Sequence, residues 1–255
     1  MSGLQLSLNI GSLCTVEFFN LGDVMQPELR YSGSTAQTGL SLARNKVLRN
    51  TYWMLGLTMI PTLIGAMIGL STNFSFLAQA PIMGPLIMLA VMMGLLFGVS
   101  AMRNSVMGIA LLFAFTFVAG WWMGPMLQYA LHFKNGAQII GTAAAGTGVI
   151  FFTLAGIATV TKKDFGFMQN FLFVGLVLLI IASVANLFFA IPAASLAISA
   201  VAVLLFSGFI LFDVSRIVNG GETNYVMATM GIYLSLYNLF MSLLHLLLAF
   251  SGEKD

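Results

Sequence analysis

The feature that most constrains the fold is a series of seven apolar runs, each about as long as a bilayer is thick. A helix needs roughly 20 apolar residues to cross the hydrocarbon core of about 30 Å. Because lipid cannot satisfy backbone N–H and C=O groups, each run is predicted to be helical. The expected fold is therefore an all-α membrane protein, a seven-transmembrane-helix bundle. The runs cover approximately residues 51–71, 83–101, 106–131, 137–160, 168–190, 194–214 and 225–250.

The composition indicates the same class of protein. Of the 255 residues, 59% are hydrophobic and 7% are charged, whereas a soluble domain carries about 25% charged residues. The lipid bilayer is thus the expected surrounding. The basic residues are too few to follow a phosphate backbone, so no nucleic-acid partner is expected. With one cysteine and two histidines, no internal disulfide, metal site or cofactor is expected.

The distribution of lysine and arginine predicts the orientation, because cytoplasmic loops of membrane proteins are enriched in these residues. With the N-terminus inside, eight cations fall on inner segments and two on outer segments. We therefore expect an N-inside, C-outside topology, with Asp213 near the inner end of the sixth run. The inner cations are Arg30, Arg44, Lys46, Arg49, Arg103, Lys162, Lys163 and Arg216, and the outer ones are Lys134 and Lys254.

The chain divides into two parts at the first run. Residues 1–46 are predicted to form a cytosolic, flexible N-terminal tail, and residues 47–255 the transmembrane domain with a short C-terminal tail. Leucine and isoleucine alternate with polar residues from Leu4 to Ile10, which is a strand-like period. A docked strand or amphipathic piece therefore stays open as an alternative for this part of the tail.

Two clusters of small residues are expected to bring helices close together. Gly65 and Gly69 form a GxxxG pair in the first run, and residues 141–148 read GTAAAGTG in the fourth. Small residues at four-residue spacing let helix backbones approach where lipid provides no hydrophobic driving force. Ordinary packing within the bundle is the expected role of both clusters.

One carboxylate falls inside an apolar run, Asp213, and an ionisable residue within a span is a functional hypothesis by default. In a low-dielectric surrounding a carboxyl group retains its proton more readily, and a nearby cation opposes this. Arg103 and Arg216 are the candidate cations. Asp213 would then be a titratable latch. The alternative is a helix-end residue that pairs with Arg216 or is solvated at the headgroup level.

Four polar residues form a stripe along the seventh run. Ser235, Asn238, Ser242 and His245 are spaced by three, four and three residues, which places them on one helical face. They are expected to face the bundle interior, either as interhelical hydrogen-bonding groups or as the lining of a polar pathway. A hydrolytic enzyme is not expected, because the spans hold no second carboxylate and a helical Ser242–His245 pair is not a nucleophile elbow.

Three stretches carry a resemblance to a known family. The segment 210–247 resembles the C-terminal signature of the Bax inhibitor (TMBIM) family of seven-span membrane proteins. Two others look like its bacterial, YccA-like branch, whose typical member modulates the FtsH protease. The resemblance covers about residues 45–250. The three stretches read ILFDVSRIVNGGETNYVMATMGIYLSLYNLFMSLLHLL (210–247), NKVLRNTYWMLGLT (45–58) and FAFTFVAGWWMGPML (113–127).

The resemblance implies two functions that are not exclusive. The pH-gated members of the family are calcium leak channels with aspartates on spans six and seven and a basic latch at the inner end of span two. Asp213 matches the first aspartate and Arg103 lies within about a residue of the latch, but Ser235 stands where the second aspartate would be. The YccA-like branch resembles this chain in having serine there. It implies an inner-membrane protein that binds an FtsH-type AAA protease through its flexible tail and modulates its action.

Overall fold

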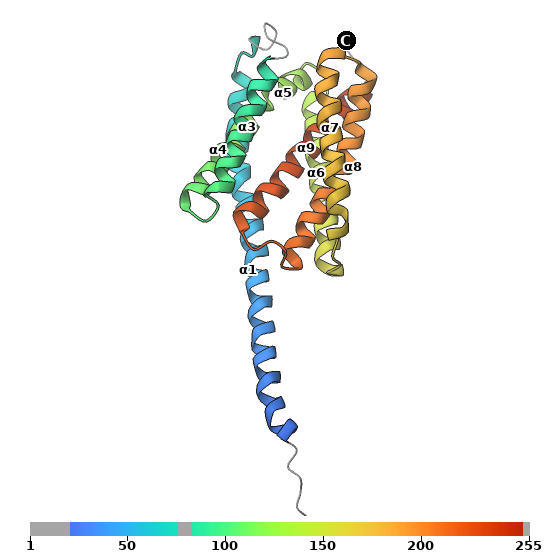
Figure 1. Ribbon diagram of the computed structural model, residues 1–255. Helices are drawn as coiled ribbons and strands as arrows, with labels where there is room; N and C mark the ends of the chain where they lie inside the picture. Colours follow the sequence, from blue (N-terminus) through green and yellow to red (C-terminus); the bar gives the residue numbers. More distant parts are fainter. Residues whose placement is uncertain (1–20, 76–82, 252–255) are drawn as a thin grey trace, which may run out of the picture. The chain divides into compact units, whose positions relative to one another are not determined.

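The computed structural model describes residues 21–75 and 83–251, and all regular structure within these ranges is helical (Figure 1). Seven helical segments are long and apolar enough to cross a membrane, so the predicted seven-span bundle is confirmed. Val106–Leu131 counts as one such segment although it consists of two helices. The helices are α1 (Leu21–Ser71), α3 (Met83–Ala101), α4 (Val106–Trp122), α5 (Gly124–Leu131), α6 (Gly136–Thr161), α7 (Gln169–Phe189), α8 (Pro192–Val218) and α9 (Tyr225–Ser251), with a 3-10 turn η1 (Gly166–Met168) before α7.

The chain forms two compact units, residues 1–42 and residues 43–255. The domain boundary expected at residue 46 stays a prediction. Residues 21–46, assigned to the tail from the sequence, lie within α1. The alternating segment from Leu4 to Ile10 lies outside the described residues, and the flexible, cytosolic tail stays a prediction.

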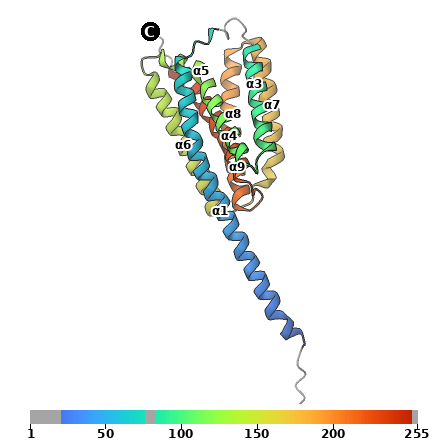
Figure 2. The same ribbon diagram turned by 90° about the vertical axis from the view of Figure 1, so that its left-hand side faces the viewer.

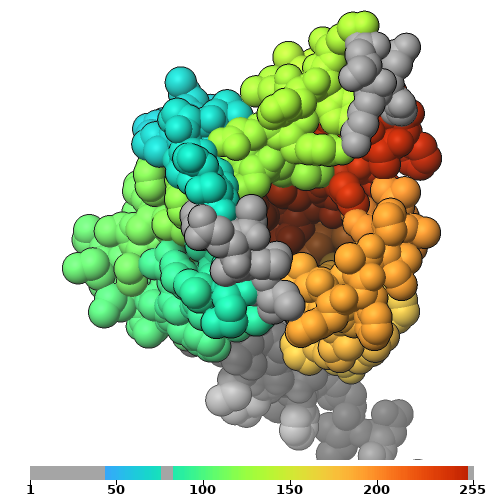
Figure 3. All heavy atoms as spheres, turned by 90° about the horizontal axis from the view of Figure 1, so that it is seen from above, coloured from blue at the N-terminus to red at the C-terminus, as the bar shows by residue number. Residues whose placement is uncertain are grey.

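Helix α9 is the centre of the second unit. It crosses between α3 and α4 on one side and α6 and α8 on the other (Figures 1 and 2). Ten of its residues are buried, although the helix is long and apolar enough to cross a membrane. In the view from above, its atoms lie at the bottom of a hollow between the α5–α6 side and the α7–α8 side (Figure 3). The last helix of the chain therefore supplies much of the core.

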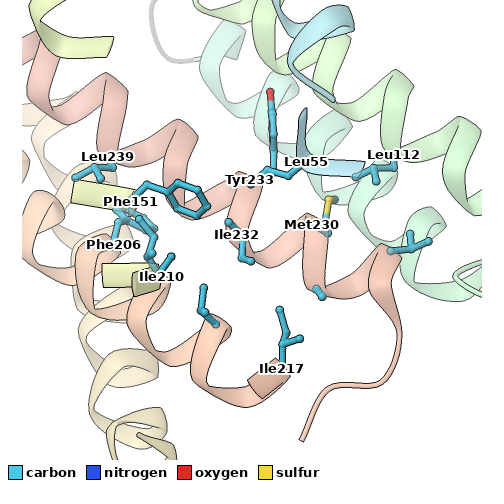
Figure 4. Packing of buried hydrophobic residues seen from close by; sticks show 14 of the residues in the cluster. Leu55, Leu112, Phe151, Phe206, Ile210, Ile217, Met230, Ile232, Tyr233 and Leu239 are labelled. Carbon is cyan, nitrogen blue, oxygen red and sulfur yellow. The ribbon is translucent and has the colours of Figure 1, made fainter. Parts of the chain in front are cut away.

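The core beneath this hollow is aliphatic and aromatic (Figure 4). Ile232 and Leu239 of α9 are fully buried and belong to one cluster with Phe151 of α6 and Ile210 of α8. By contrast, α7 has one buried residue, Leu172. Since α7 is nearly all apolar and its described contacts are with α8 and η1, its outer surface faces lipid, as expected of a peripheral span.

Helix α1 crosses α4 and α5 at backbone distance, and glycines on both sides make this possible. A Cβ atom on Gly65 would overlap the carbonyl oxygen of Phe117, and one on Gly120 would overlap that of Thr62. Gly69 and Gly124 meet in the same way. The packing role predicted for the GxxxG pair of α1 is confirmed, and Gly120 and Gly124 form its counterpart at the same spacing. We call this contact the glycine crossing.

The small-residue cluster of α6 behaves differently. No atom of another helix lies within 4 Å of a Cβ built on Gly141 or Gly148, and Gly146 would meet a leucine side-chain carbon at 3.7 Å. The prediction that this cluster brings helices close together is therefore wrong for Gly141 and Gly148. The missing side chains of these two glycines leave open space beside α6 and do not bring a second helix into contact with it.

Candidate functional site

Asp213 lies in a small pocket of about 230 Å³ between α8, α9 and the loop that joins them. Its carboxylate is directed at Gly231 of α9, where a Cβ atom would lie 3.1 Å from Oδ2. Glycine at this position therefore gives the carboxylate room between two closely packed helices. Arg216, Glu222 and Leu96 of α3 also line the pocket.

Arg216 is engaged by the loop and not by Asp213. Its Nη2 lies 3.3 Å from Oε2 of Glu222 and donates to the carbonyl of Gly221 at 3.4 Å. Its guanidinium also lies 5.5 Å from the ring centre of Phe212. Among the described residues no cation forms an ion pair with Asp213. A partly exposed pair such as Arg216–Glu222 contributes little to stability, so it leaves Arg216 able to exchange partners.

Arg103 is tied to the same end of the bundle through its backbone. Asn224 donates from Nδ2 to the carbonyl of Arg103 at 3.2 Å and to Oδ1 of Asn104 at 2.7 Å. Its Oδ1 accepts from the N–H groups of Val226 and Met227 at the start of α9. The side chain of Arg103 is exposed. Asp213, Arg103 and Arg216 thus lie at the same end of the bundle, but no ion pair joins Asp213 to either arginine. The titratable latch remains a prediction.

The polar stripe of α9 is mostly satisfied within its own helix. Ser235 donates to the carbonyl of Gly231 at 3.1 Å and Asn238 to that of Leu234 at 2.8 Å. Ser235 is buried, and Ser242 is half-buried. These bonds are of the kind that lets a polar side chain lie in an apolar surrounding without a partner helix. The pathway-lining role of the stripe remains a prediction.

His245 is the member of the stripe that reaches another helix. Its Nδ1 lies 2.7 Å from Oγ of Ser199, and its Nε2 lies 3.4 Å from Oγ of Ser195. Both serines are on α8, one turn apart. The imidazole thus bridges the start of α8 and the end of α9, at the opposite end of these helices from Asp213.

Sequence reasoning missed the hydrogen-bonded junction at the middle of the bundle. The hydroxyl of Tyr233 lies 2.8 Å from Oγ1 of Thr62 and donates to the carbonyl of Thr116 at 3.3 Å. It joins α9 to α1 and α4 beside the glycine crossing. Glu222 was missed as well, although its position six residues after Arg216 in the GGETNY segment was a usable signal. Tyr233 gave no such signal, because its partners lie 171 and 117 residues away.

Comparisons with known proteins agree with this architecture. The profile of the family described as "Inhibitor of apoptosis-promoting Bax1" matches residues 44–252. An uncharacterized membrane protein of Vibrio cholerae is 43% identical over 213 residues, 84% of this chain and 93% of the relative. The modulator of FtsH protease YccA of Escherichia coli is 41% identical over 216 residues, 85% of this chain and 95% of the relative.

The names of the relatives also locate the protein. A second Escherichia coli relative with the same identity and coverage is named inner membrane protein YccA. Together with the seven apolar helices, this makes the chain a multi-pass protein of the bacterial inner membrane. On the family match and on these relatives, the chain belongs to the Bax inhibitor family and is similar to its YccA-type bacterial members.

Proposed function

We propose that this protein binds an FtsH-type AAA protease of the inner membrane and modulates its action on other membrane proteins. The observation that carries the proposal is the 41% identity to a modulator of FtsH protease over 95% of that relative. The likeness extends over the whole bundle, so both chains use the same framework of spans.

The proposed action is non-enzymatic. Asp213 is the one carboxylate within the described spans, and an acid pair that shares a proton needs two. His245 hydrogen-bonds the serines of α8, and Ser242 lies on the same face of the same helix. Binding and competition for the protease would then be the means of modulation.

The N-terminal part of the chain is the proposed handle for the protease. The family profile begins at residue 44, so residues 1–43 precede the conserved framework. An AAA protease must engage a polypeptide segment that it can pull. If the segment is attached to a stably folded bundle, the protease would stay occupied with it while the bundle itself is degraded only slowly.

The test is co-purification from membranes with a tagged protease, together with the turnover of a second membrane substrate. We expect the full chain to be recovered with the protease and to slow the second substrate. Deletion of residues 1–30 should abolish both effects, whereas a scrambled tail of equal length should retain binding if the protease needs only an unstructured end. Equal recovery of the full chain with an unrelated membrane protein as bait would refute the proposal.

The Asp213 pocket supports a second candidate, a pH-sensitive leak pathway for calcium or another cation. The pocket holds Asp213 and Glu222 beside a single arginine, so acidic groups outnumber the cation. Hard cations such as Ca²⁺ prefer carboxylate oxygens. In proteoliposomes, Asp213→Asn should abolish a pH-dependent Ca²⁺ flux, and Asp164→Asn is the matched control at another acidic position. Absence of flux above empty liposomes would exclude this candidate.

A further inference from the structure

A long apolar groove runs between α1, α6 and α9, and neither proposed function uses it. Its volume is about 870 Å³. Its rim is exposed, with 64% of the surface of Leu63, 75% of Phe152 and 81% of Val160 accessible. Because all three helices are membrane spans, the groove opens to the hydrocarbon of the bilayer and not to water.

The walls of the groove offer almost no polar atoms. The hydroxyls of Thr147 and Thr159 each donate to a carbonyl of their own helix, one turn earlier, at 2.8 and 2.7 Å. The hydroxyl of Tyr233 is bonded to Thr62, and Tyr52 and Tyr237 bring the other two tyrosine hydroxyls of the lining. Because the wall is otherwise apolar, it selects an apolar occupant, and a polar group placed there would lose most of its own hydrogen bonds.

The groove is open partly because three of its lining residues are glycines. Gly56 of α1 and Gly148 and Gly156 of α6 line the groove, and no atom of another element lies within 4 Å of a Cβ built on any of them. A Cβ atom at these positions would extend into the groove without meeting the protein. An unfilled space of this size forfeits dispersion contacts along its walls, so something in the membrane must occupy it.

The dimensions favour a single hydrocarbon chain over a helix. On α6 the lining runs from Ile140 to Val160, about 30 Å at 1.5 Å per residue. A helix of that length, about 10–12 Å across with its side chains, would occupy roughly 2,400 Å³ or more, well above the 870 Å³ of the groove. A polymethylene chain, with carbon–carbon contacts of about 3.5–4.0 Å, fits within the groove.

Three cations lie close in sequence to the residues that line one end of the groove. Arg49 lies three residues before Tyr52 and seven before Gly56, on the same face of α1 as these lining residues. Lys162 and Lys163 directly follow α6. All three cations are exposed. The neighbouring acid, Asp164, accepts from the N–H of Gly166 at 2.7 Å.

The backbone at this end is fixed. Ser215 and Asn219 of α8 donate to the carbonyl of Lys163 at 2.9 and 3.1 Å. The turn after α6 is thereby held against α8, and its two lysines follow Thr159 and Val160, which line the groove. Basic clusters between spans on the cytoplasmic side suit anionic lipid headgroups, and the charge distribution predicts that this end is cytoplasmic.

We infer that the groove is a binding site for an anionic phospholipid of the inner leaflet. One acyl chain lies along the glycines of α1 and α6, and Arg49, Lys162 and Lys163 hold the phosphate. The site is independent of the Asp213 pocket, which lies between α8 and α9.

The acyl-chain part is tested by filling the groove. Full-length protein is delipidated in detergent and titrated with phosphatidylglycerol, and bound lipid is counted by native mass spectrometry. Gly148→Leu and, as a second filled variant, Ala144→Leu should weaken binding at least about tenfold, the equivalent of about two buried methylenes. Gly141→Leu is the matched control, because Gly141 is equally open but does not line the groove. Unchanged binding in both filled variants overturns the inference.

The headgroup part is tested with the cations. Arg49→Gln combined with Lys162→Gln should lower the affinity for phosphatidylglycerol to that for phosphatidylcholine with the same chains, whereas Arg103→Gln should leave it unchanged. Equal binding of both lipids by the unaltered protein would overturn the anionic selectivity. A photocrosslinking residue in place of Phe152 should label lipid in membranes, and labelling of a protein helix instead would overturn the acyl-chain assignment.

Discussion

The glycine crossing and the groove are built from the same kind of sequence and have opposite structures. At the crossing, Gly65 and Gly120 bring two helix backbones into contact. In the groove, Gly56 and Gly148 leave an open channel along α1 and α6. Helix α1 takes part in both, and the two stretches overlap, because residues 52–66 contribute to the groove and residues 62–69 to the crossing. Glycine in a span therefore indicates close approach, but the approaching group is a helix in one case and, by our inference, a lipid chain in the other.

The largest expected effect comes from adding a side chain at the crossing. Gly120→Leu would place carbon atoms on the backbone of Thr62, which cannot move aside as a flexible side chain can. Overpacking a core costs about 1–3 kcal/mol and occasionally more, and we expect a loss of at least about 3 kcal/mol here. Thermal unfolding in detergent measures it. Unfolding at the temperature of the unaltered protein would show that the crossing is looser than described.

The next effect concerns the hydrogen bonds beside the crossing. Tyr233→Phe removes the hydroxyl that joins Thr62 to the carbonyl of Thr116. Both buried groups lose a partner, so we expect a loss of about 1–3 kcal/mol. A double-mutant cycle with Thr62→Val, measured by denaturant titration, should show coupling between the two positions. Strict additivity would mean that the two hydroxyls do not interact.

A smaller effect is expected where α1 ends at the crossing. Gln128 of α5 donates from Nε2 to the carbonyls of Gly69, Leu70 and Thr72, at 2.9–3.1 Å. Gln128→Met keeps the shape but removes the donor, at a cost of about 1 kcal/mol, because part of this site is exposed and water can replace the bonds. The measurement is hydrogen exchange at the end of α1. Protection equal to that of the unaltered protein would contradict the capping role.

The smallest effect sharpens the comparison most. Gly148→Leu adds a whole leucine side chain, yet a Cβ atom at this position has no neighbour within 4 Å. We expect the free energy of unfolding to change by less than about 0.5 kcal/mol, as at a surface position. The same thermal assay serves as for Gly120→Leu. A loss as large as at Gly120 would show that the groove is closed in the folded protein.

Much of the fold could be predicted from the sequence, because hydropathy reports directly on the medium that surrounds each span. The seven spans and the GxxxG pair of α1 follow from such local signals. The partners of Tyr233 and His245 could not be predicted, since a hydroxyl or imidazole in an apolar run does not indicate which helix it will meet. The pairing of Arg216 with Glu222 could have been predicted, because the two lie six residues apart across a Gly-Gly turn, in which Gly220 has a positive φ of 81°.

The same limit explains the failure at α6. Spacing predicts that small residues share a face, but whether that face is covered depends on the tilt of neighbouring helices. That tilt is set by contacts far away in the chain, such as the glycine crossing and the α8–α9 packing. The Asp213 pocket is a similar case, since its floor is Gly231 of another helix.

The central position of α9 has a consequence for synthesis. Among the described helices it is synthesised last, yet its Tyr233 links α1 to α4 and its apolar residues complete the largest core cluster. A chain that ends before Tyr225 would therefore contain six spans with no common centre. Its threonines and aliphatic faces would stay open to lipid and to other chains. The bundle can therefore close only after α9 has been synthesised and inserted.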